Sequence, residues 1–344
     1  ALNRSAALQA AETPLNQPVL DRAVEGLLRS YDRFNGGFGD APKFPQPMNL
    51  DFLLVAYGRT HDPATLQAVT HTLNKMAWGG IYDQLGGGFH RYSTDDLWLV
   101  PHFEKMLYDN AQLARTYLHA WQVTGNPLFR RIVEETLDYV TREMTDPAGG
   151  FYSAQDADSE GEEGKFFLWR PAEVTALLGA EDAWLFSAYY GVTARGNFHE
   201  GGPGANILHI QRDAAVVAAD LGVSVERLMA AVERGRNVLF EARTQRIAPG
   251  RDDKVLAEWN GLMLHAFAEA GAALDRPDYT ATARRAARFL LNAMIQEAGS
   301  WRLEAESGDS QLPASVRSEA APIRLYRTYK AGRAHLNAYL EDYA

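Results

Sequence analysis

The densest group of side chains capable of acid–base chemistry lies between positions 83 and 109. It contains Asp83, His90, His102, Glu104 and Asp109. In a functional interpretation, His90 and His102 are acid–base groups, and Glu104 or Asp109 is their carboxylate partner. In a structural interpretation, the carboxylates stabilise a helix amino terminus and the histidines hydrogen-bond loop carbonyls. Both interpretations stay open, and we take His90, His102 and Glu104 as catalytic candidates and Asp83 and Asp109 as substrate-binding candidates.

A second acidic segment follows, with Asp156, Asp158 and three glutamates between positions 160 and 163. Its spacing starts like a calcium-binding loop, but the twelfth position is Phe167 where that loop needs a glutamate. The calcium-loop interpretation therefore fails, and no metal is predicted, while a looser cation site stays open. The alternative is an acidic, solvated loop in which Asp156 alone turns into the site. We keep Asp156 as a catalytic candidate and Asp158 as a substrate-binding candidate.

The third group surrounds Glu258, which is the most distinctive carboxylate outside the first group. It occupies the place that Tyr108 has in an internally repeated segment, so the scaffold does not explain it. We take Glu258 as a catalytic candidate. Candidates for substrate binding are its neighbours Asp253, Trp259 and Asn260, together with Tyr92.

These residue types suit carbohydrate chemistry. Glycoside hydrolysis needs two carboxyl groups, about 5–5.5 Å apart in retaining enzymes and about 6.5–9.5 Å apart in inverting ones. Epimerisation needs instead a proton acceptor and a donor on two faces of one carbon, often histidines. The glycines at 86–88 do not form a phosphate-binding loop, because neither the strand context nor the Gly-Lys-Ser/Thr sequence is present. No cofactor is predicted.

Helical periodicity dominates the elements that would position these residues. Apolar residues recur three or four positions apart in the segments 19–31, 48–57, 66–78, 103–121, 128–144, 225–240, 256–274 and 279–295. Pro101, Pro127 and Pro277 stand where helices would begin. Short strands are expected at 165–169 and 206–210.

An internal repeat groups the helices into pairs. Asn110, Pro127, Met144 and Phe151 each have a counterpart 150 residues later, at Asn260, Pro277, Met294 and Trp301. The first helix of a pair is nearly all apolar, which suits an inner position, and the second has a charged face. Segments 181–190 and 225–243 resemble a divergent pair.

Alternating inner and outer helices predict an all-α fold, an (α/α) toroid that forms one domain over residues 1–344. We count an opening outer helix, four pairs and the start of a fifth, so we expect the toroid to be truncated at its carboxyl end. One face of the array would then be exposed or covered by a partner.

Longer blocks resemble a known family. They are residues 37–45, 83–92, 100–110, 150–164, 252–256 and 259–262. Together they are similar to the helical region of the YyaL-like, spermatogenesis-associated thioredoxin-domain proteins. The resemblance implies a six-hairpin glycosidase-like toroid, akin to the N-acylglucosamine 2-epimerase fold. It also implies a thioredoxin-like domain as a partner in the full-length protein.

Composition excludes several function classes. The 344 residues include 34 Lys and Arg against 44 Asp and Glu, a net charge of −10, and no cysteine. Disulfides, thiolate metal sites and cysteine nucleophiles are therefore excluded. Nucleic acid and membranes are not expected as partners, and a cytoplasmic location is predicted.

The predicted function is a carbohydrate-directed domain, either a glycoside hydrolase or a sugar epimerase. The alternative is a non-catalytic scaffold that binds a sugar or a protein. At least three of the five catalytic candidates should line one cavity.

Overall fold

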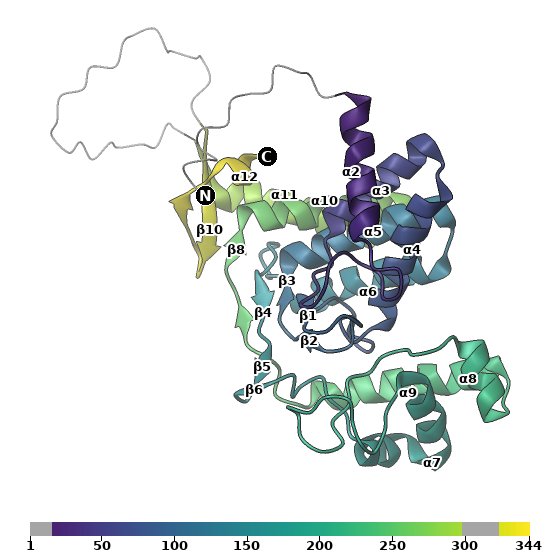
Figure 1. Ribbon diagram of the computed structural model, residues 1–344. Coiled ribbons are helices and arrows are strands. Elements are labelled where there is room, and N and C mark those ends of the chain that lie inside the picture. Colours follow the sequence, from purple (N-terminus) through teal and green to yellow (C-terminus); the bar gives the residue numbers. More distant parts are fainter. Residues whose placement is uncertain (1–15, 298–322) are drawn as a thin grey trace, which may run out of the picture.

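The structure is a computed structural model that describes residues 16–297 and 323–344. Helices dominate it (Figure 1). They are α2 (Gln17–Ser30), α3 (Pro47–Thr60), α4 (Pro63–Trp78), α5 (Leu107–Thr124), α6 (Pro127–Glu143), α7 (Pro171–Tyr190), α8 (Ala214–Leu221), α9 (Val225–Thr244), α10 (Ala257–Ala273), α11 (Pro277–Phe289), a π-helical turn η1 (Leu290–Met294) and α12 (Leu340–Tyr343).

Three antiparallel hairpins, α3–α4, α5–α6 and α10–α11, form the main body, and their inner helices lie side by side in the order α3, α5, α10. The sequence pattern explains this arrangement. Helix α5 buries residues around most of its circumference, whereas α6 buries one apolar stripe that includes Phe129, Ile132 and Leu137. The array is therefore of the (α/α) toroid type that the periodicity predicts, and α2 packs against the first hairpin.

The pair formed by α7 and α9 does not follow α5–α6 in the array, although we counted it as one of the successive helix pairs. The two helices do pack against each other, as predicted, but α5 contacts α10 directly. The pair is thus an excursion from the arc of inner helices rather than a member of it. It has its own apolar core, which includes Phe186, Leu228 and Leu239, and it lies below the main body in Figure 1.

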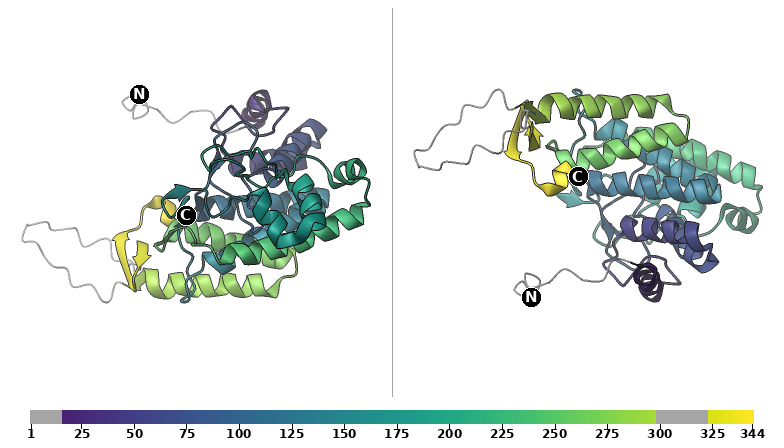
Figure 2. Two further views of the ribbon diagram at one scale, coloured as in Figure 1. Left: turned by 90° about the horizontal axis from the view of Figure 1, so that it is seen from below. Right: turned by 90° about the horizontal axis from the view of Figure 1, so that it is seen from above.

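Short strands border the inner helices at their amino-terminal ends. The strands are β1 (Tyr92–Ser93), β2 (Pro101–His102), β3 (Lys105–Met106), β4 (Ala154–Gln155), β5 (Asp158–Ser159), β6 (Glu162–Glu163), β7 (Arg251–Asp252), β8 (Val255–Leu256), β9 (Ile295–Glu297), β10 (Ile323–Lys330) and β11 (Arg333–Asn337). Strand β4 pairs with both β3 and β7, and β10 pairs with β8, β9 and β11. Figure 2 shows β10 at the ends of α10 and α11.

Strand pairing also explains where local predictions were wrong. Helices α6 and α11 begin at Pro127 and Pro277, as predicted, but Pro101 lies in β2 and α5 begins only at Leu107. The preceding residues are held as a strand, because Lys105 and Met106 pair with β4. Of the strands expected at 165–169 and 206–210, one isolated bridge remains, between Trp169 and Asn206.

The internal repeat is confirmed at its two asparagines. Asn110 accepts a hydrogen bond from the Phe89 amide at 2.7 Å and donates to the carbonyls of Phe89 and Met106. Asn260 repeats the pattern with the Phe151 amide, also at 2.7 Å, and with the carbonyls of Phe151 and Leu256. Both asparagines therefore fasten a glycine-rich loop to the first turn of an inner helix. The predicted counterpart of Phe151, Trp301, lies outside the described residues.

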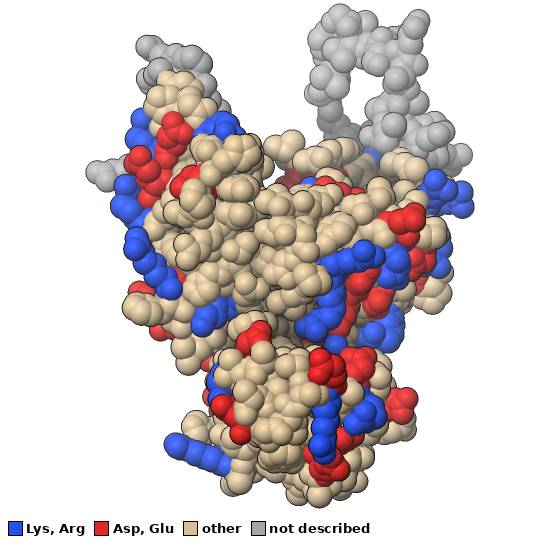
Figure 3. Space-filling view, turned by 90° about the vertical axis from the view of Figure 1, so that its right-hand side faces the viewer, with Lys and Arg blue, Asp and Glu red and all other residues tan. Residues whose placement is uncertain are grey.

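The surface carries charges of both signs. Figure 3 shows Lys and Arg interspersed with Asp and Glu on the face that it presents. On α3, Met48 and Val55 are exposed apolar side chains, while coverage by a partner stays a prediction. Among the described residues, no helix combines the length and apolar character that crossing a membrane requires.

Candidate active site at the amino-terminal ends of the inner helices

An open pocket of about 450 Å³ lies beside strands β3, β4 and β7 and the start of α10. We call it the mouth pocket. It is lined by Glu104, Met106, Ser153, Ala154, Asp156, Gly250, Arg251, Asp252, Lys254, Leu256 and Trp259. Three residues predicted from separate segments, Glu104, Asp156 and Trp259, thus share one pocket.

Glu104 is held at the edge of this pocket by charged neighbours. Its Oε2 accepts a hydrogen bond from Arg91 Nη1 at 2.9 Å, and His102 Nε2 lies 3.7 Å from the same oxygen. The ion pair limits the freedom of Glu104 and leaves its second carboxylate oxygen for another partner. A fixed carboxylate of this kind can act as a base or as a nucleophile.

His102 and Tyr92 support Glu104 without lining the mouth pocket. His102 Nδ1 lies 2.7 Å from Glu163 Oε1, and the same oxygen accepts a hydrogen bond from the Phe103 amide. The His102 ring stacks on Tyr92 with 5.1 Å between ring centroids. His102 is therefore oriented from two sides, and its Nε2 is directed toward Glu104.

Asp109 lies behind Glu104 in the first turn of α5. Burial raises the pKa of the Asp109 carboxyl to about 7; Arg91 opposes this shift, and the nearby Glu104 carboxylate adds to it. The preceding residue, Tyr108, contacts the Trp259 ring with 4.8 Å between centroids. The start of α5 thus carries a buried carboxyl whose pKa is about 7 and, one residue earlier, a ring that contacts Trp259 in the wall of the pocket.

Two candidates from the first group lie elsewhere. His90 is 1 % exposed, sits edge-on to Phe103 and Phe167, and has Nδ1 2.8 Å from the Phe103 carbonyl. Burial, followed by the charge of Lys105, lowers the pKa of His90 to about 3. Asp83 is buried in ion pairs with Lys105 and Arg243. The placement of His90 matches the structural interpretation, a histidine bonded to a loop carbonyl, whereas Asp83 is a partner of buried cations, a role that neither interpretation gave it.

Glu258 and Asp253 face the carboxyl-terminal segment. The Glu258 amide donates to Asp342 Oδ1, and burial together with the Glu341 charge raises the pKa of the Glu258 carboxyl. Asp253 Oδ1 lies 2.7 Å from Lys330 Nζ. Neither Glu258 nor Asp253 lines the mouth pocket.

Two further substrate-binding candidates also lie outside the mouth pocket: Asp158 is exposed, and Asn260 holds a loop. Of the five catalytic candidates, only Glu104 and Asp156 line the mouth pocket. The expected meeting of at least three is therefore wrong for this pocket.

A polar network on the inner helices was missed by the sequence analysis. Arg115 donates to Glu269 at 2.8 Å, and His119 lies between Asp51 and Glu269 at 3.1 and 2.9 Å. The signal that could have revealed it is a stripe of half-buried polar residues on α5, an otherwise apolar helix: Tyr108, Gln112, Arg115 and His119.

No arrangement for a metal ion accompanies these residues. Within 16–297 and 323–344, no three His, Cys, Asp or Glu side chains are placed to hold one. The mouth pocket instead combines three carboxylates (Glu104, Asp156 and Asp252, the last ion-paired with Lys254), an aromatic ring and flanking cations. This combination can bind a polyhydroxylated ligand and move protons on it.

Comparison with known proteins identifies relatives in sequence. No family model matches the chain. Spermatogenesis-associated protein 20 of Mus musculus is 40% identical over 299 residues, which are 80% of this chain and 38% of that protein. The Homo sapiens protein of the same name is 39% identical over 310 residues, 83% of this chain and 39% of that protein. The chain thus spans about two fifths of the length of these relatives.

Solved structures with a related arrangement have low sequence identity. A sugar epimerase from a ruminal bacterium is 12% identical, with 92% of both chains covered and a TM-score of 0.37. Cellobiose 2-epimerase from Bacillus thermoamylovorans is 11% identical, with 93% of both chains covered and a TM-score of 0.37.

Proposed function

This chain belongs to the family of spermatogenesis-associated protein 20, and we propose that its mouth pocket binds a carbohydrate and hydrolyses a glycosidic bond. The observation that carries the proposal is that Glu104 and Asp156 line one open pocket together with Trp259. Hydrolysis of a glycoside needs two carboxyl groups, and an aromatic ring offers a face on which the apolar side of a sugar packs.

The placement of the histidines favours hydrolysis over epimerisation. Two histidines on opposite faces of a sugar carbon would support epimerisation, but His90 is enclosed by aromatic rings away from the pocket. His102 is committed to Glu163 and Glu104. Because neither lines the mouth pocket, the carboxyl groups are the better assignment for the chemistry.

Each carboxyl has a role in the proposed reaction. Glu104, ion-paired with Arg91, acts as the base or nucleophile, and Asp156 acts as the general acid that protonates the leaving-group oxygen as the glycosidic bond breaks. His102 and Asp109 are positioning residues. Protonated Asp109 adds no charge beside Glu104, whereas ionised Asp109 places a second negative charge there.

The proposal is tested with a panel of nitrophenyl glycosides, in which released nitrophenol reports turnover. Glu104→Gln and Asp156→Asn should each lower kcat by roughly 100-fold or more, the usual contribution of a positioned acid or base. The matched control is Asp158→Asn, which removes a nearby exposed carboxylate and should leave turnover unchanged.

A pH profile adds an independent readout. Since the pKa of Asp109 is about 7, activity should fall as the pH rises through 7, and Asp109→Asn should remove this limb. If sugars bind without turnover, and binding persists in Glu104→Gln and Asp156→Asn, hydrolysis is wrong. The chain would then be a binding scaffold.

The activity of the longer protein is a separate matter, because this chain spans about two fifths of its relatives. The thioredoxin-like partner domain implied by the resemblance stays a prediction. So do the single-domain assignment over 1–344, the cytoplasmic location, and the expectation that nucleic acid and membranes are not partners.

A further inference from the structure

We propose that a second pocket, on the other side of the β3–β4–β7 sheet from the mouth pocket, binds a small organic anion whose carboxylate or phosphate is carried on an aromatic body. We call it the rear pocket. Its volume is about 140 Å³, and it is lined by Asp83, Lys105, Tyr139, Arg142, Glu143, Gln155, Phe166, Phe167, Phe240, Arg243, Thr244, Arg246 and Ala248. This inference goes beyond the proposed hydrolysis and does not depend on it.

Strand geometry separates the two pockets. Successive side chains of a strand point to opposite faces. Along the segment that ends in β3, Glu104 and Met106 line the mouth pocket while Lys105 lines the rear pocket. Along β4 and the residue that follows it, the same alternation puts Ala154 and Asp156 in the mouth pocket and Gln155 in the rear pocket.

The rear pocket contains more positive than negative charge. Lys105, Arg142, Arg243 and Arg246 are four cations, against the two acids Asp83 and Glu143. Glu173 compensates Arg246 from outside the lining at 3.4 Å, and an excess of positive charge still remains. Such an excess in a mostly buried site is costly unless an anion compensates it.

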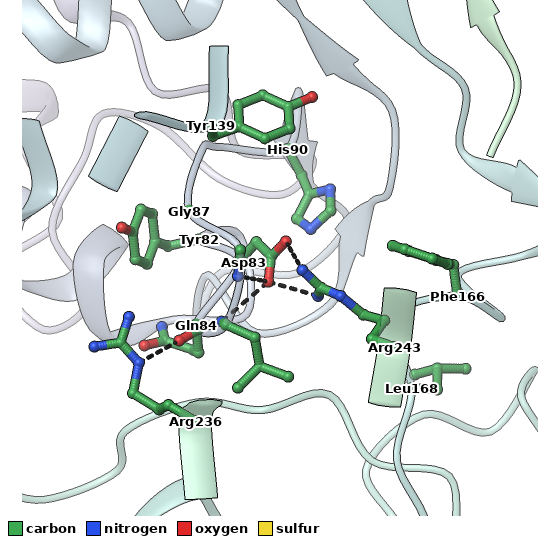
Figure 4. A network of polar contacts seen from close by, with 12 residues as sticks. Tyr82, Asp83, Gln84, Gly87, His90, Tyr139, Phe166, Leu168, Arg236 and Arg243 are labelled. Carbon is green, nitrogen blue, oxygen red and sulfur yellow. Dashed lines mark hydrogen bonds and ion pairs between the residues drawn. The ribbon is translucent and has the colours of Figure 1, made fainter. Parts of the chain in front are cut away.

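One buried carboxylate serves two buried cations. Arg243 Nη1 and Nη2 donate to the two Asp83 oxygens at 2.8 and 2.9 Å, as Figure 4 shows, and Lys105 Nζ donates to Asp83 Oδ2 at 2.9 Å. Lys105 and Arg243 are 1 % and 4 % exposed. Burial lowers the pKa of Lys105 to about 8; Asp83 opposes this shift, and the Arg243 charge reinforces it. A second anion would relieve both cations.

Hydrogen-bond donors remain for such a ligand. Lys105 Nζ donates to Asp83 and to the Gly87 carbonyl, which engages two of its three protons. Arg142 donates through Nε to Glu143 and through Nη2 to the Gly86 carbonyl. Among the described residues, its Nη1 has no acceptor within hydrogen-bond distance. Both groups can therefore bind a carboxylate or phosphate oxygen without losing their present partners.

The aromatic rings that line the rear pocket indicate what kind of molecule would carry the anionic group. The Lys105 ammonium lies 4.3 Å from the Tyr139 ring centre, the Arg142 guanidinium 4.8 Å from that of Phe240, and the Arg243 guanidinium 5.1 Å from that of Phe166. The volume of about 140 Å³ is close to that of a cavity of about 150 Å³ that holds one benzene molecule. A single aromatic ring with one anionic substituent fits this space and these rings, and a neutral sugar does not use the cations.

The test uses phenyl phosphate and benzoate as probes, titrated calorimetrically into the full chain. Inorganic phosphate and phenol are the comparison ligands, since each has only one half of the required chemistry. We expect saturable binding of at least one probe, and at least tenfold weaker binding of both comparison ligands. Arg142→Gln should weaken the binding of the probe about tenfold. Lys105→Met should abolish it if that variant folds.

The matched control is Arg130→Gln, which removes another partly exposed arginine from the same helix, α6, where Arg130 pairs with Glu134 outside the rear pocket. This variant should bind the probe like the wild type. The proposal is overturned if neither probe binds saturably, if phenol binds as tightly, or if Arg142→Gln has no more effect than Arg130→Gln. Because Arg142 is partly exposed, its variant should fold and keep the test decisive.

Discussion

Asn110 and Asn260 are single residues that each satisfy three backbone groups. Each accepts from one buried amide and donates to two carbonyls, and both are at most 1 % exposed. A buried polar group without a partner costs about 1–3 kcal/mol. These two side chains therefore matter more for the stability of the loops than for chemistry, although Asn260 was a substrate-binding candidate.

We expect Asn110→Ala and Asn260→Ala each to lower the free energy of unfolding by about 2–5 kcal/mol, because three groups lose their partner at once. Urea denaturation measures the change. Asn126→Ala is the control. It removes the cap of α6, whose Oδ1 accepts one hydrogen bond, from the Leu128 amide, and it should cost about 1 kcal/mol. Equal losses in the three variants would contradict the three-bond account.

Among the elements, the glycine-rich loop at 86–88 is fitted closely to the outer helix α6. A Cβ atom at Gly87 would lie 2.3 Å from the Glu135 carbonyl oxygen, and the residue has a φ of +76°. The loop carries the Gly87 carbonyl to Lys105 Nζ at 2.8 Å. The conformation of this loop therefore helps to fix Lys105, which also pairs with the buried Asp83.

Gly87→Ala should cost about 2–5 kcal/mol of stability, the sum of a left-handed backbone penalty and overpacking against a helix backbone. Gly39→Ala is the matched control, since Gly39 has nearly the same φ, +77°, but open space within 4 Å of a Cβ. It should lose only about 1–2 kcal/mol. Thermal unfolding of the two variants, compared with the wild type, decides whether the close contact matters.

The sequence predicted where individual helices lie better than it predicted which helices pack against one another. Periodicity placed α6 within one residue, at 128–144 against Pro127–Glu143, but it began α4 three residues late, at 66, and ran α11 to 295, beyond its end at Phe289. It could not show that α5 contacts α10 across the α7–α9 excursion, because local pattern carries no information about packing partners. It also missed β10 and β11, despite an Ala-Gly turn at 331–332 between alternating residues.

For the candidate site, Glu104, Asp156 and Trp259 line one pocket, because loops at one end of a hairpin array converge, whereas the roles assigned to them stay predictions. The prediction that Glu258 shares this pocket was wrong, because Glu258 lies against a segment more than 80 residues later in the chain, where its amide donates to Asp342. The sequence analysis overlooked Lys105, since the segment was expected to be helical and the alternation of a strand gives that lysine its own pocket. In each case, contacts between segments far apart in the chain determined where the side chain lies.

For the whole molecule, the Asp51–His119–Glu269–Arg115 network joins α3, α5 and α10. His119 has a carboxylate at each ring nitrogen, so the protonated ring satisfies both. The hydrogen bond to Asp51 raises the pKa of His119, burial opposes it, and Glu269 adds to it. Burial would raise the pKa of Glu269, but Arg115 and His119 together lower it.

The signs define a pH window for this network. A raised histidine pKa contributes stability that is fully present below the unfolded value of 6.5 and is lost as the pH rises through the folded value. A lowered glutamate pKa contributes stability that is present above 4.5 and is lost as the pH falls through the folded value. The three inner helices should therefore be held together best between those two pH values.

We expect His119→Gln to destabilise the chain most between pH 4.5 and 6.5, and progressively less as the pH rises further, because the wild type then loses the imidazolium that the variant lacks. Urea midpoints across this range measure the difference in free energy of unfolding. The control is His199→Gln, at an exposed position, whose difference from the wild type should stay flat with pH. If the His119→Gln difference is equally flat, the network does not act as a charged link between α3, α5 and α10, and the arc that positions the mouth pocket depends on apolar packing alone.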